Sequence, residues 1–356
     1  MMRINKENIK NNRTVRYAYY FVNGIVHRKA LKKKAEKTIE TFGVRFQNPE
    51  EREKTIADML QMNSRYGYGF SEYLYYHFAE KAMPERCSFV ADWEHLGYTC
   101  AMNDPDNAEI FDNKWITYKT FHPYYRRDVQ ICKGAEDAQK FQRFLSDHER
   151  VVIKPLDASC GHGVKIIDTK ADGEISIEKY KVLLKESKGR FIVEEFIDQA
   201  EEMSRFHPAS VNTVRMPTIR VGETVHIVNP FFRIGQHGNH VDNAGSGGII
   251  CAIDAETGII FAAADEHGKR FEKQPDTEEQ IIGYAIPKWN EAKDLVTELA
   301  KVIPDNHYTG WDLALREDGW VLVEANRRGQ FVWQIASQKG FRAEINHYLK
   351  KLGLKY

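Results

Sequence analysis

The sequence lacks an excess of charge of either sign. Its 356 residues include 51 Lys and Arg and 51 Asp and Glu, so the formal net charge is +0. Proteins that bind nucleic acids usually carry a basic excess that neutralises phosphates, and the balanced total gives that class no support. The Lys-rich segment 28–37 (RKALKKKAEK) has helical spacing, which is typical of a solvated helix face. We therefore expect no nucleic-acid partner.

Cysteines and long apolar runs are also scarce. The five cysteines are scattered without CxxC spacing, which favours reduced thiols over a disulfide framework. The segment 1–20 carries charge but lacks the apolar core of a secretory signal. No stretch approaches the roughly 18 apolar residues of a membrane-spanning helix. These absences predict a cytoplasmic protein without a membrane span.

The order of the expected helices and strands indicates an α+β fold with more than one lobe. The chain is long for one compact domain, and helical patterns near 28–41, 50–62 and 71–82 dominate its first part. Short β-type runs and hairpin patterns with interspersed helices follow, which favours α+β over an alternating βαβ fold. We divide the chain into an N-terminal helical region at 1–110, a small lobe at 111–200 and a C-terminal lobe at 201–356.

The segment GWDLALREDGWVLVEANRRG (310–329) is expected to form a β-hairpin with oxygen-bearing side chains near its ends. Its strands are rich in Trp, Leu and Val, and the connection contains an Asp-Gly turn pair. Asp312 lies on the first strand, and Glu324 and Asn326 close the second. Apolar residues would pack better at these positions, so the three side chains indicate a ligand. Their oxygen atoms are of the kind that Mg²⁺ prefers, together with substrate phosphates.

A Gly-containing loop, KPLDASCGHGV (154–164), lies between two short β-type runs. Backbone N–H groups of small residues can wrap phosphate oxygens, and Lys154 adds a positive charge. It is not a Walker A loop, because the lysine precedes it and strands lie on both sides. A Gly-rich hairpin loop without a ligand is the alternative. Lys114 lies 40 residues before Lys154, and Glu194-Glu195 ends a strand 40 residues after it, so the set predicts a nucleotide–magnesium site.

These motifs, taken in order, resemble the ATP-grasp superfamily. The matching residues are Lys114 in DNKW, Lys154 in VVIKP, the loop DASCGHG, the strand FIVEEFI, Asp312 in GWD, and Glu324 and Asn326 in VEAN. The resemblance covers roughly residues 85–335 and is closest to the sugar-transfer-associated branch, which is related to α-L-glutamate ligases. The stretches SVNTVRMPTIR, FRIGQHGNHVDNAGSGGI and DAETG are similar to that branch's own patterns.

The resemblance implies an ATP-grasp fold, in which two α+β lobes grip ATP after a mainly helical N-terminal region. It implies that the ATP phosphates are contacted by Lys114 and Lys154, and that the closing loop contains Ser159, Gly161 and Gly163. The hinge beside adenine would start at Glu194 and Glu195, use backbone groups of Phe196 and Ile197, and be followed by a ribose-binding acid, Glu201 or Glu202. One or two Mg²⁺ ions would be held by Asp312, Glu324 and Asn326.

Arg215 and Arg233 lie on neighbouring predicted strands and are candidate catalytic residues together with Lys154. Arginine forks bind carboxylate or phosphate through two parallel hydrogen bonds, so they could orient the γ-phosphate or an acyl phosphate. Ordinary ion pairing on the strand surface is the alternative. The loop 242–248 (DNAGSGG) is shaped for the close approach of a ligand, and a plain surface loop is its alternative.

We predict an ATP- and Mg²⁺-dependent ligase, ADP-forming, that activates a carboxylate as an acyl phosphate and joins it to an amine. Its partners would be small-molecule carboxylate and amine substrates, and the resemblance implies a sugar or sugar precursor in surface-polysaccharide biosynthesis. A kinase of a sugar hydroxyl on the same fold and a non-catalytic nucleotide-binding module are the alternatives. A complete set of three metal ligands argues against the binding module. The sequence leaves the donor, the acceptor and the oligomeric state open.

Overall fold

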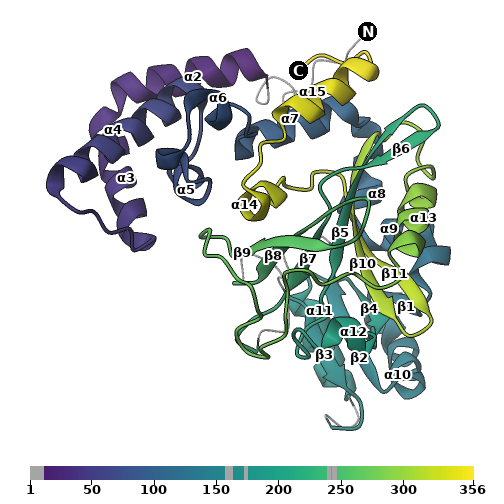
Figure 1. Cartoon of the computed structure of the whole chain (residues 1–356). Helices are drawn as coiled ribbons and strands as arrows, with labels where there is room; N and C mark the ends of the chain where they lie inside the picture. The colour runs from purple at the N-terminus through teal and green to yellow at the C-terminus, as the bar shows by residue number, and fades with distance from the viewer. Residues whose placement is uncertain (1–11, 157–162, 172–174, 239–241, 243–246) are drawn as a thin grey trace.

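The computed structural model describes residues 12–156, 163–171, 175–238, 242 and 247–356. These residues form a helical N-terminal region, a four-stranded sheet and a seven-stranded sheet, with antiparallel pairing throughout (Figure 1). The α+β class predicted from the sequence is therefore confirmed. Across the described ranges, no helix combines the length and the apolar character needed to cross a membrane.

Local sequence signals set the ends of the longest N-terminal helix, α4 (Pro49–Tyr66). The Asn48 side chain accepts a hydrogen bond from the Glu51 N–H at 2.9 Å, and Pro49 occupies the first helical position. Gly67 ends the helix with a φ of 76°, in the left-handed region that glycine adopts readily. The other helices that precede the first strand are α2 (Arg13–Val26), α3 (Arg28–Thr41), α5 (Phe70–Tyr75), η1 (Phe78–Glu80), α6 (Met83–Arg86), α7 (Asp92–Met102), η2 (Pro105–Asn107), α8 (Ala108–Asp112) and α9 (Lys114–Tyr125). The last two pack against the large sheet (Figure 1).

The small sheet has the strand order β1-β4-β2-β3 and is covered by helices on one face. Val151 and Val193 share an apolar core with Phe141 of α10 and Leu183 of α11. Because side chains alternate along a strand, Lys154 and Glu194 point from the opposite face. The elements are β1 (Val129–Cys132), η3 (Ala135–Asp137), α10 (Ala138–Asp147), β2 (Arg150–Pro155), β3 (Lys165–Asp168), α11 (Ile177–Glu186) and β4 (Phe191–Glu195).

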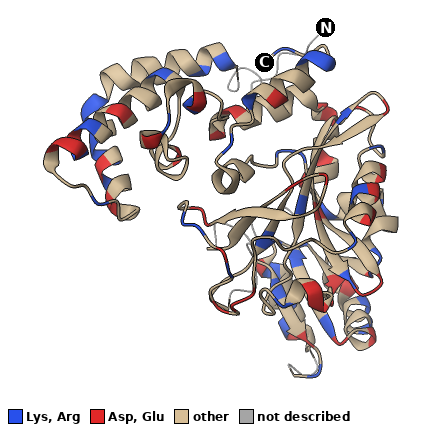
Figure 2. Ribbon diagram, in the orientation of Figure 1, with Lys and Arg blue, Asp and Glu red and all other residues tan. Residues whose placement is uncertain are grey.

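The large sheet has the order β11-β10-β5-β7-β8-β9, with β6 paired to β5. Trp311 and Met216 lie in a core that includes Val296 of α13. Charged residues of both signs are spread over the sheet-containing part (Figure 2). The elements are α12 (Glu201–Ser204), β5 (Val214–Val221), β6 (Thr224–Ile227), β7 (Phe231–Ile234), β8 (Ile249–Ile253), β9 (Ile260–Ala264), α13 (Trp289–Leu299), β10 (Tyr308–Arg316), β11 (Gly319–Asn326), α14 (Trp333–Ser337) and α15 (Arg342–Lys351).

The predicted hairpin is confirmed as β10 and β11, which pair along their whole length. Gly319 follows the turn with a φ of 122°, which explains the Asp-Gly pair in the sequence. The register shifts between Asp312 and Leu313, because Asp312 faces Glu324 whereas Leu313 faces Leu322. The hairpin therefore accommodates one extra residue at the point where its carboxylates lie.

The last helix returns to the N-terminal region, where α15 lies beside α7 (Figure 1). The Arg342 guanidinium contacts the Glu94 carboxylate at 2.5 Å, and the Glu94 side chain is fully buried. Phe341 and Ile345 also share an apolar core with Tyr98 of α7 and Tyr308 of β10. The helical region and the last helix are thus packed together.

Candidate functional site

Glu194, at the end of β4, is the centre of a buried charge cluster on the face of the small sheet opposite α10 and α11. Its Oε2 accepts hydrogen bonds from Lys154 Nζ at 2.9 Å and from Arg127 Nη2 at 2.6 Å. The Glu194 side chain is only 3% exposed. Burial alone would raise the pKa of this carboxyl, but the charges of Lys154 and Arg127 lower it to about 2. The carboxylate is therefore ionised and holds the Lys154 ammonium in place.

Arg127 joins this cluster to the large sheet. Its Nη1 donates to the Leu322 carbonyl on β11 at 2.7 Å and to the Tyr125 carbonyl at 3.2 Å. The guanidinium also lies over the Tyr125 ring, 4.4 Å from its centroid. Burial is the main reason that the pKa of Tyr125 is raised, and Glu194 and Glu324 both add to it. The charges of Glu194 on the small sheet and Glu324 on the large sheet therefore both act on one buried tyrosine. Sequence reasoning missed Arg127, whose only signal is its place in an Arg-Arg pair before β1.

Asp312 forms a second buried charge cluster, on β10. Arg215 on the adjacent strand β5 binds it through two nitrogens, Nε to Oδ1 and Nη2 to Oδ2, the latter at 2.8 Å. Arg233 on β7 approaches Oδ2 with Nη2 at 3.0 Å, and Asn326 Nδ2 donates to Oδ2 at 3.3 Å. Burial acts to raise the pKa of Asp312, but Arg215 and Arg233 overcome it and hold the pKa below its usual range. The structure thus brings the two candidate arginines onto one predicted metal ligand.

Glu324 is placed beside Asp312 by the irregularity in the hairpin. The shift of register makes Glu324 the partner of Asp312 across the strands, so the two carboxylates lie on one face. Glu324 is half-buried, and within the described ranges no hydrogen bond or ion pair engages its carboxylate. Asn326 uses its amide N–H on Asp312, which leaves its Oδ1 for another partner. These oxygen donors fit a hard divalent cation. They are the Glu324 carboxylate, the Asn326 side-chain carbonyl, and the Asp312 carboxylate, which also binds two arginines.

Arg233 also connects Asp312 to a second buried acid. Its Nε lies 3.4 Å from Asp242 Oδ2, and its Nη2 donates to Thr213 Oγ1 at 2.6 Å. Asp242 in turn accepts a hydrogen bond from the Thr213 backbone N–H at 2.9 Å. Burial raises the pKa of Asp242, an effect that Arg233 opposes. The guanidinium is therefore fixed between two carboxylates. Of the rest of the predicted ligand loop, residues 243–246 lie outside the described residues, and Gly247 and Gly248 lead into β8.

The predicted phosphate contacts lie close to the end of β2. Lys114, the first residue of α9, donates its backbone N–H to the Leu156 carbonyl at 3.5 Å. Gly163 resumes the chain after the loop with a φ of 73°, and a Cβ atom there would lie 2.9 Å from Pro155 Cγ. Glycine is therefore required on both conformational and steric grounds. Ser159 and Gly161 lie outside the described residues.

The predicted hinge runs from the small sheet to the large one. The backbone N–H of Glu195 donates to Asp128 at 2.9 Å, and that of Phe196 donates to Arg150 at 3.1 Å. Ile197 packs against Ala314 and Val321 of the hairpin. Glu201 and Glu202, the two candidates for the ribose, lie on α12 and are exposed. The segment thus connects the small sheet to the large one, whereas the predicted contacts to adenine and ribose stay predictions.

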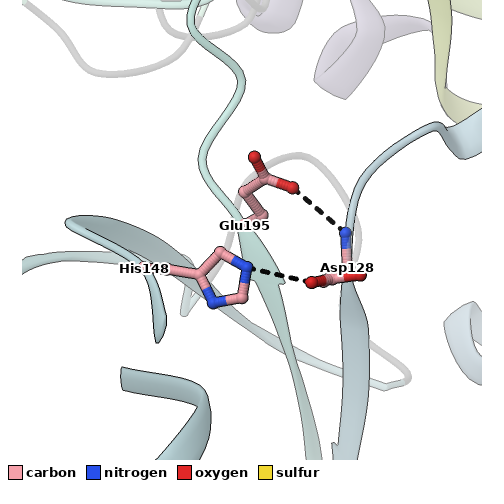
Figure 3. Close-up of side chains that lie close together, drawn as sticks. All are labelled: Asp128, His148 and Glu195. Atoms are coloured by element: carbon pink, nitrogen blue, oxygen red, sulfur yellow. Dashed lines mark hydrogen bonds and ion pairs between the residues drawn. The ribbon is translucent and has the colours of Figure 1, made fainter. Parts of the chain in front are cut away.

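Glu195 turns its side chain to the helix-covered face of the small sheet, away from Lys154. There it forms a group with Asp128 and His148, whose potential ligand atoms all lie within 4.8 Å of one another (Figure 3). His148 Nδ1 lies 2.8 Å from the Phe144 carbonyl, and Nε2 lies 3.1 Å from Asp128 Oδ2. Both ring nitrogens of His148 are therefore already engaged, one by the Phe144 carbonyl and the other by Asp128, and hydrogen bonds within the group account for the arrangement. We therefore assign no cation to this group.

The family described as sugar-transfer associated ATP-grasp matches residues 95–350 of the chain. No curated protein matches the chain. Among solved structures, D-alanyl-alanine synthetase A from Vibrio cholerae is similar at 9% identity and a TM-score of 0.43, over 69% of this chain and 62% of that one. The D-alanine–D-alanine ligase from Bacillus anthracis is similar at 14% identity and a TM-score of 0.41, over 70% and 68% of the two chains.

A third solved structure, an N5-carboxyaminoimidazole synthetase from Staphylococcus aureus in complex with ADP, has 10% identity and a TM-score of 0.41. The match covers 65% of this chain and 48% of that one. The chain therefore spans less than two thirds of the length of the Vibrio cholerae and Staphylococcus aureus proteins.

Proposed function

Because the chain belongs to the sugar-transfer associated ATP-grasp family, we propose that it is a ligase that uses ATP and Mg²⁺ to join a carboxylate to an amine. One observation carries the proposal: Arg215, Arg233 and three oxygen-bearing side chains gather around the irregularity in the hairpin. Cations at this position suit the phosphoryl group of a nucleotide or an acyl phosphate, and oxygen ligands suit the metal that accompanies it.

The residues that would hold the metal are Asp312, Glu324 and Asn326. Mg²⁺ bound there would supply positive charge next to the transferring phosphoryl group. Glu324 is the ligand that the metal could reach without displacing a partner, whereas Asp312 already binds Arg215. The proposal of a metal site therefore depends most on Glu324. Arg215 would remain on Asp312 and present its other N–H groups to the anionic substrate, and Arg233 would add positive charge beside it.

Lys154 would bind a phosphate from the small-sheet side. Its ammonium has three N–H donors, and Glu194 accepts from one of them at 2.9 Å. Within the part of the chain that the structure describes, the other two donors have no acceptor, and the Lys154 side chain is 17% exposed. Glu194 acts here as a positioning residue, because its carboxylate fixes the ammonium. Lys114 and the loop before Gly163 would complete the phosphate contacts, and the proposed lobes at 111–200 and 201–356 would close on the nucleotide.

The reaction that we propose has two steps. A carboxylate oxygen attacks the γ-phosphorus of ATP, ADP leaves, and an acyl phosphate forms. The amine then attacks the carbonyl carbon, loses a proton, and phosphate leaves with the oxygen that bridged carbon and phosphorus. Lys154, Arg215 and Arg233 would stabilise the negative charge on the phosphoryl group in both steps. We further propose that one substrate is a sugar acid or an amino sugar used for surface polysaccharide, because the family is described as sugar-transfer associated.

The test is a screen for condensation by mass spectrometry. The full chain would be incubated with ATP, Mg²⁺ and mixtures of sugar acids, amino sugars and amino acids, with the Glu324→Gln variant as the control. We expect a condensed product, ADP and phosphate in equal amounts. A carboxylate substrate labelled with ¹⁸O should pass one labelled oxygen to the phosphate. A phosphorylated sugar as the stable product would contradict the ligase and favour a kinase. Release of phosphate without label would also contradict the ligase.

A further inference from the structure

Helix α2 packs against the rest of the N-terminal region through residues on one of its faces. Tyr17 and Tyr20 pack against Trp93, with ring centroids 5.3 and 5.9 Å apart. One turn further on, Gly24 faces α4 so closely that a Cβ atom there would lie 2.4 Å from Ser64 Cβ. These positions follow each other at helical spacing and form the inward face of α2. The opposite face therefore points away from the protein.

This outward face is apolar. Its exposed side chains, with exposed fractions from 50% to 66%, are Val15, Tyr19, Phe21, Val22, Ile25 and Val26. They make up six of the 13 large hydrophobic side chains that are exposed in the described part of the chain. A surface helix normally turns its charged residues outward. A group of outward apolar residues on one helix therefore marks a surface that something else covers.

The charges around α2 indicate what kind of partner would bind this apolar face. Residues 8–35 contain eight Lys and Arg but no Asp or Glu, although the whole chain has a formal net charge of +0. Arg28, Lys29, Lys33 and Lys34 follow α2 directly and are exposed, and α3 is accordingly rich in basic residues (Figure 2). The sequence predicted segment 28–37 to be a solvated basic face. That face lies directly after the exposed apolar face of α2, so the surface has a basic part and an apolar part.

The two halves meet at the junction of the helices. A hollow of about 780 Å³ there is lined by Ile25, Val26, Lys29 and Lys32, among others. Glu53 also lines it and is paired with Lys32 at 2.7 Å, so one of the lysines is neutralised. Arg13 is paired as well, with Glu94 of α7 at 3.5 Å, whereas Arg28, Lys29, Lys33 and Lys34 are exposed. Apolar and cationic groups therefore reach the surface side by side.

We propose that α2 and the first turns of α3 form a docking surface for a bilayer that contains anionic lipids. The apolar face of α2 would lie in the interface at the level of the acyl chains, and the lysines of α3 would contact the headgroups. A second copy of the chain is a poorer occupant, because a two-fold contact would bring each cationic segment against its own duplicate. The docking surface needs no nucleotide, so this proposal is independent of the proposed ligase reaction.

The test is co-sedimentation of the full chain with vesicles of phosphatidylcholine alone and of phosphatidylcholine mixed with phosphatidylglycerol. We expect binding to the mixed vesicles that weakens as salt is raised. The double variant Val22→Asp/Ile25→Asp should bind more than about tenfold less. The double variant Lys29→Gln/Lys33→Gln should lose roughly fivefold for each lysine.

Matched controls are available on α11, whose Ile177 and Val182 are 46% and 53% exposed. The control variants Ile177→Asp/Val182→Asp and Lys181→Gln/Lys185→Gln should bind vesicles like the unchanged chain. All variants alter exposed residues and should keep the melting temperature. Equal binding to both kinds of vesicle, no binding to either, or an unaffected Val22→Asp/Ile25→Asp variant would overturn the proposal. So would self-association in ultracentrifugation that this variant abolishes, because a second copy would then cover the face.

Discussion

Arg127 donates from Nη1 to the backbone carbonyl of Leu322 at 2.7 Å, across 195 residues of sequence. The same guanidinium binds Glu194 on the small sheet, so one side chain joins the Lys154 cluster to the hairpin that carries Asp312. The relative placement of the two charge clusters therefore depends on a residue that belongs to neither predicted motif.

Replacing Arg127 should destabilise the fold. Arg127→Leu removes two hydrogen bonds from a buried carboxylate, and breaking such a pair costs about 3 kcal/mol or more. We expect the melting temperature to fall by several degrees, as measured by circular dichroism. Arg143→Leu is the control, because Arg143 is exposed and should change stability by no more than about 0.5 kcal/mol. Equal melting temperatures of the two variants would show that Arg127 does not hold the sheets together.

Replacing Glu324 should abolish turnover without unfolding the protein. Glu324→Gln removes a charge from the proposed metal site and changes the volume little, and no described partner is lost. We expect ADP formation to fall by about 100-fold or more at ordinary Mg²⁺. Glu317→Gln, at an exposed position of the same hairpin, is the matched control and should keep full activity. Near-normal turnover of Glu324→Gln would remove the metal assignment.

Lys154 should affect nucleotide affinity. Lys154→Ala removes the ammonium that Glu194 positions, so we expect the affinity for Mg²⁺-ADP in calorimetry to fall by about tenfold or more. Stability should fall only modestly, because Arg127 still neutralises Glu194. Lys165→Ala on β3 is the control, since this exposed lysine pairs with Glu186. Unchanged affinity in the Lys154 variant would make Lys154 a structural residue only.

The low pKa of Glu194 predicts how stability depends on pH. A carboxyl with a pKa of about 2 in the folded chain, and about 4.3 when unfolded, favours folding by about 3 kcal/mol above the unfolded pKa. This contribution is lost as the pH falls from about 4 toward 2. The melting temperatures of the unchanged chain and of Glu194→Gln should therefore differ at pH 7 and converge in acid. A difference that stays constant down to pH 3 would show that the ionised Glu194 carboxylate is not its source.

Gly163 should be needed for more than its backbone conformation. Gly163→Ala forces an alanine to a φ of 73° and places its Cβ against Pro155, whereas Gly189→Ala, at a φ of 85°, meets nothing within 4 Å. Both should lower stability by about 1 to 2 kcal/mol. Only Gly163→Ala should also weaken binding of Mg²⁺-ADP, because it displaces the end of the predicted phosphate loop. Equal nucleotide affinities would show that Gly163 acts only as a turn residue.

Local patterns predicted several elements, although the helix expected near 71–82 ends as α5 at Tyr75 and is followed only by the short η1. The helix expected at 28–41 is α3, and the hairpin expected from Trp, Leu, Val and an Asp-Gly turn is β10–β11. The ATP-grasp assignment from ordered motifs is confirmed by the family match over residues 95–350. In each case the signal lies within a few residues of sequence, or in the order of short motifs along the chain.

Contacts between distant residues were not predictable in the same way. Arg127 reaches Glu194 across 67 residues, and no spacing rule links such positions. Asp312 was predicted as a metal ligand, but no local pattern indicates that Arg215 and Arg233 both bind it. These contacts depend on the placement of β5 and β7 next to β10, and this strand order is not contained in the pattern of any single strand.

The packing of α15 against α7 has a consequence for experiments that exchange parts between related proteins. Glu94 is fully buried, and its guanidinium partner, Arg342, lies 248 residues further along the chain. A chimera that takes the helical region up to residue 110 from one parent and the remainder from another would place this carboxylate opposite a foreign helix. The N-terminal helices and the final helix therefore form one unit of exchange, although they lie at opposite ends of the described sequence.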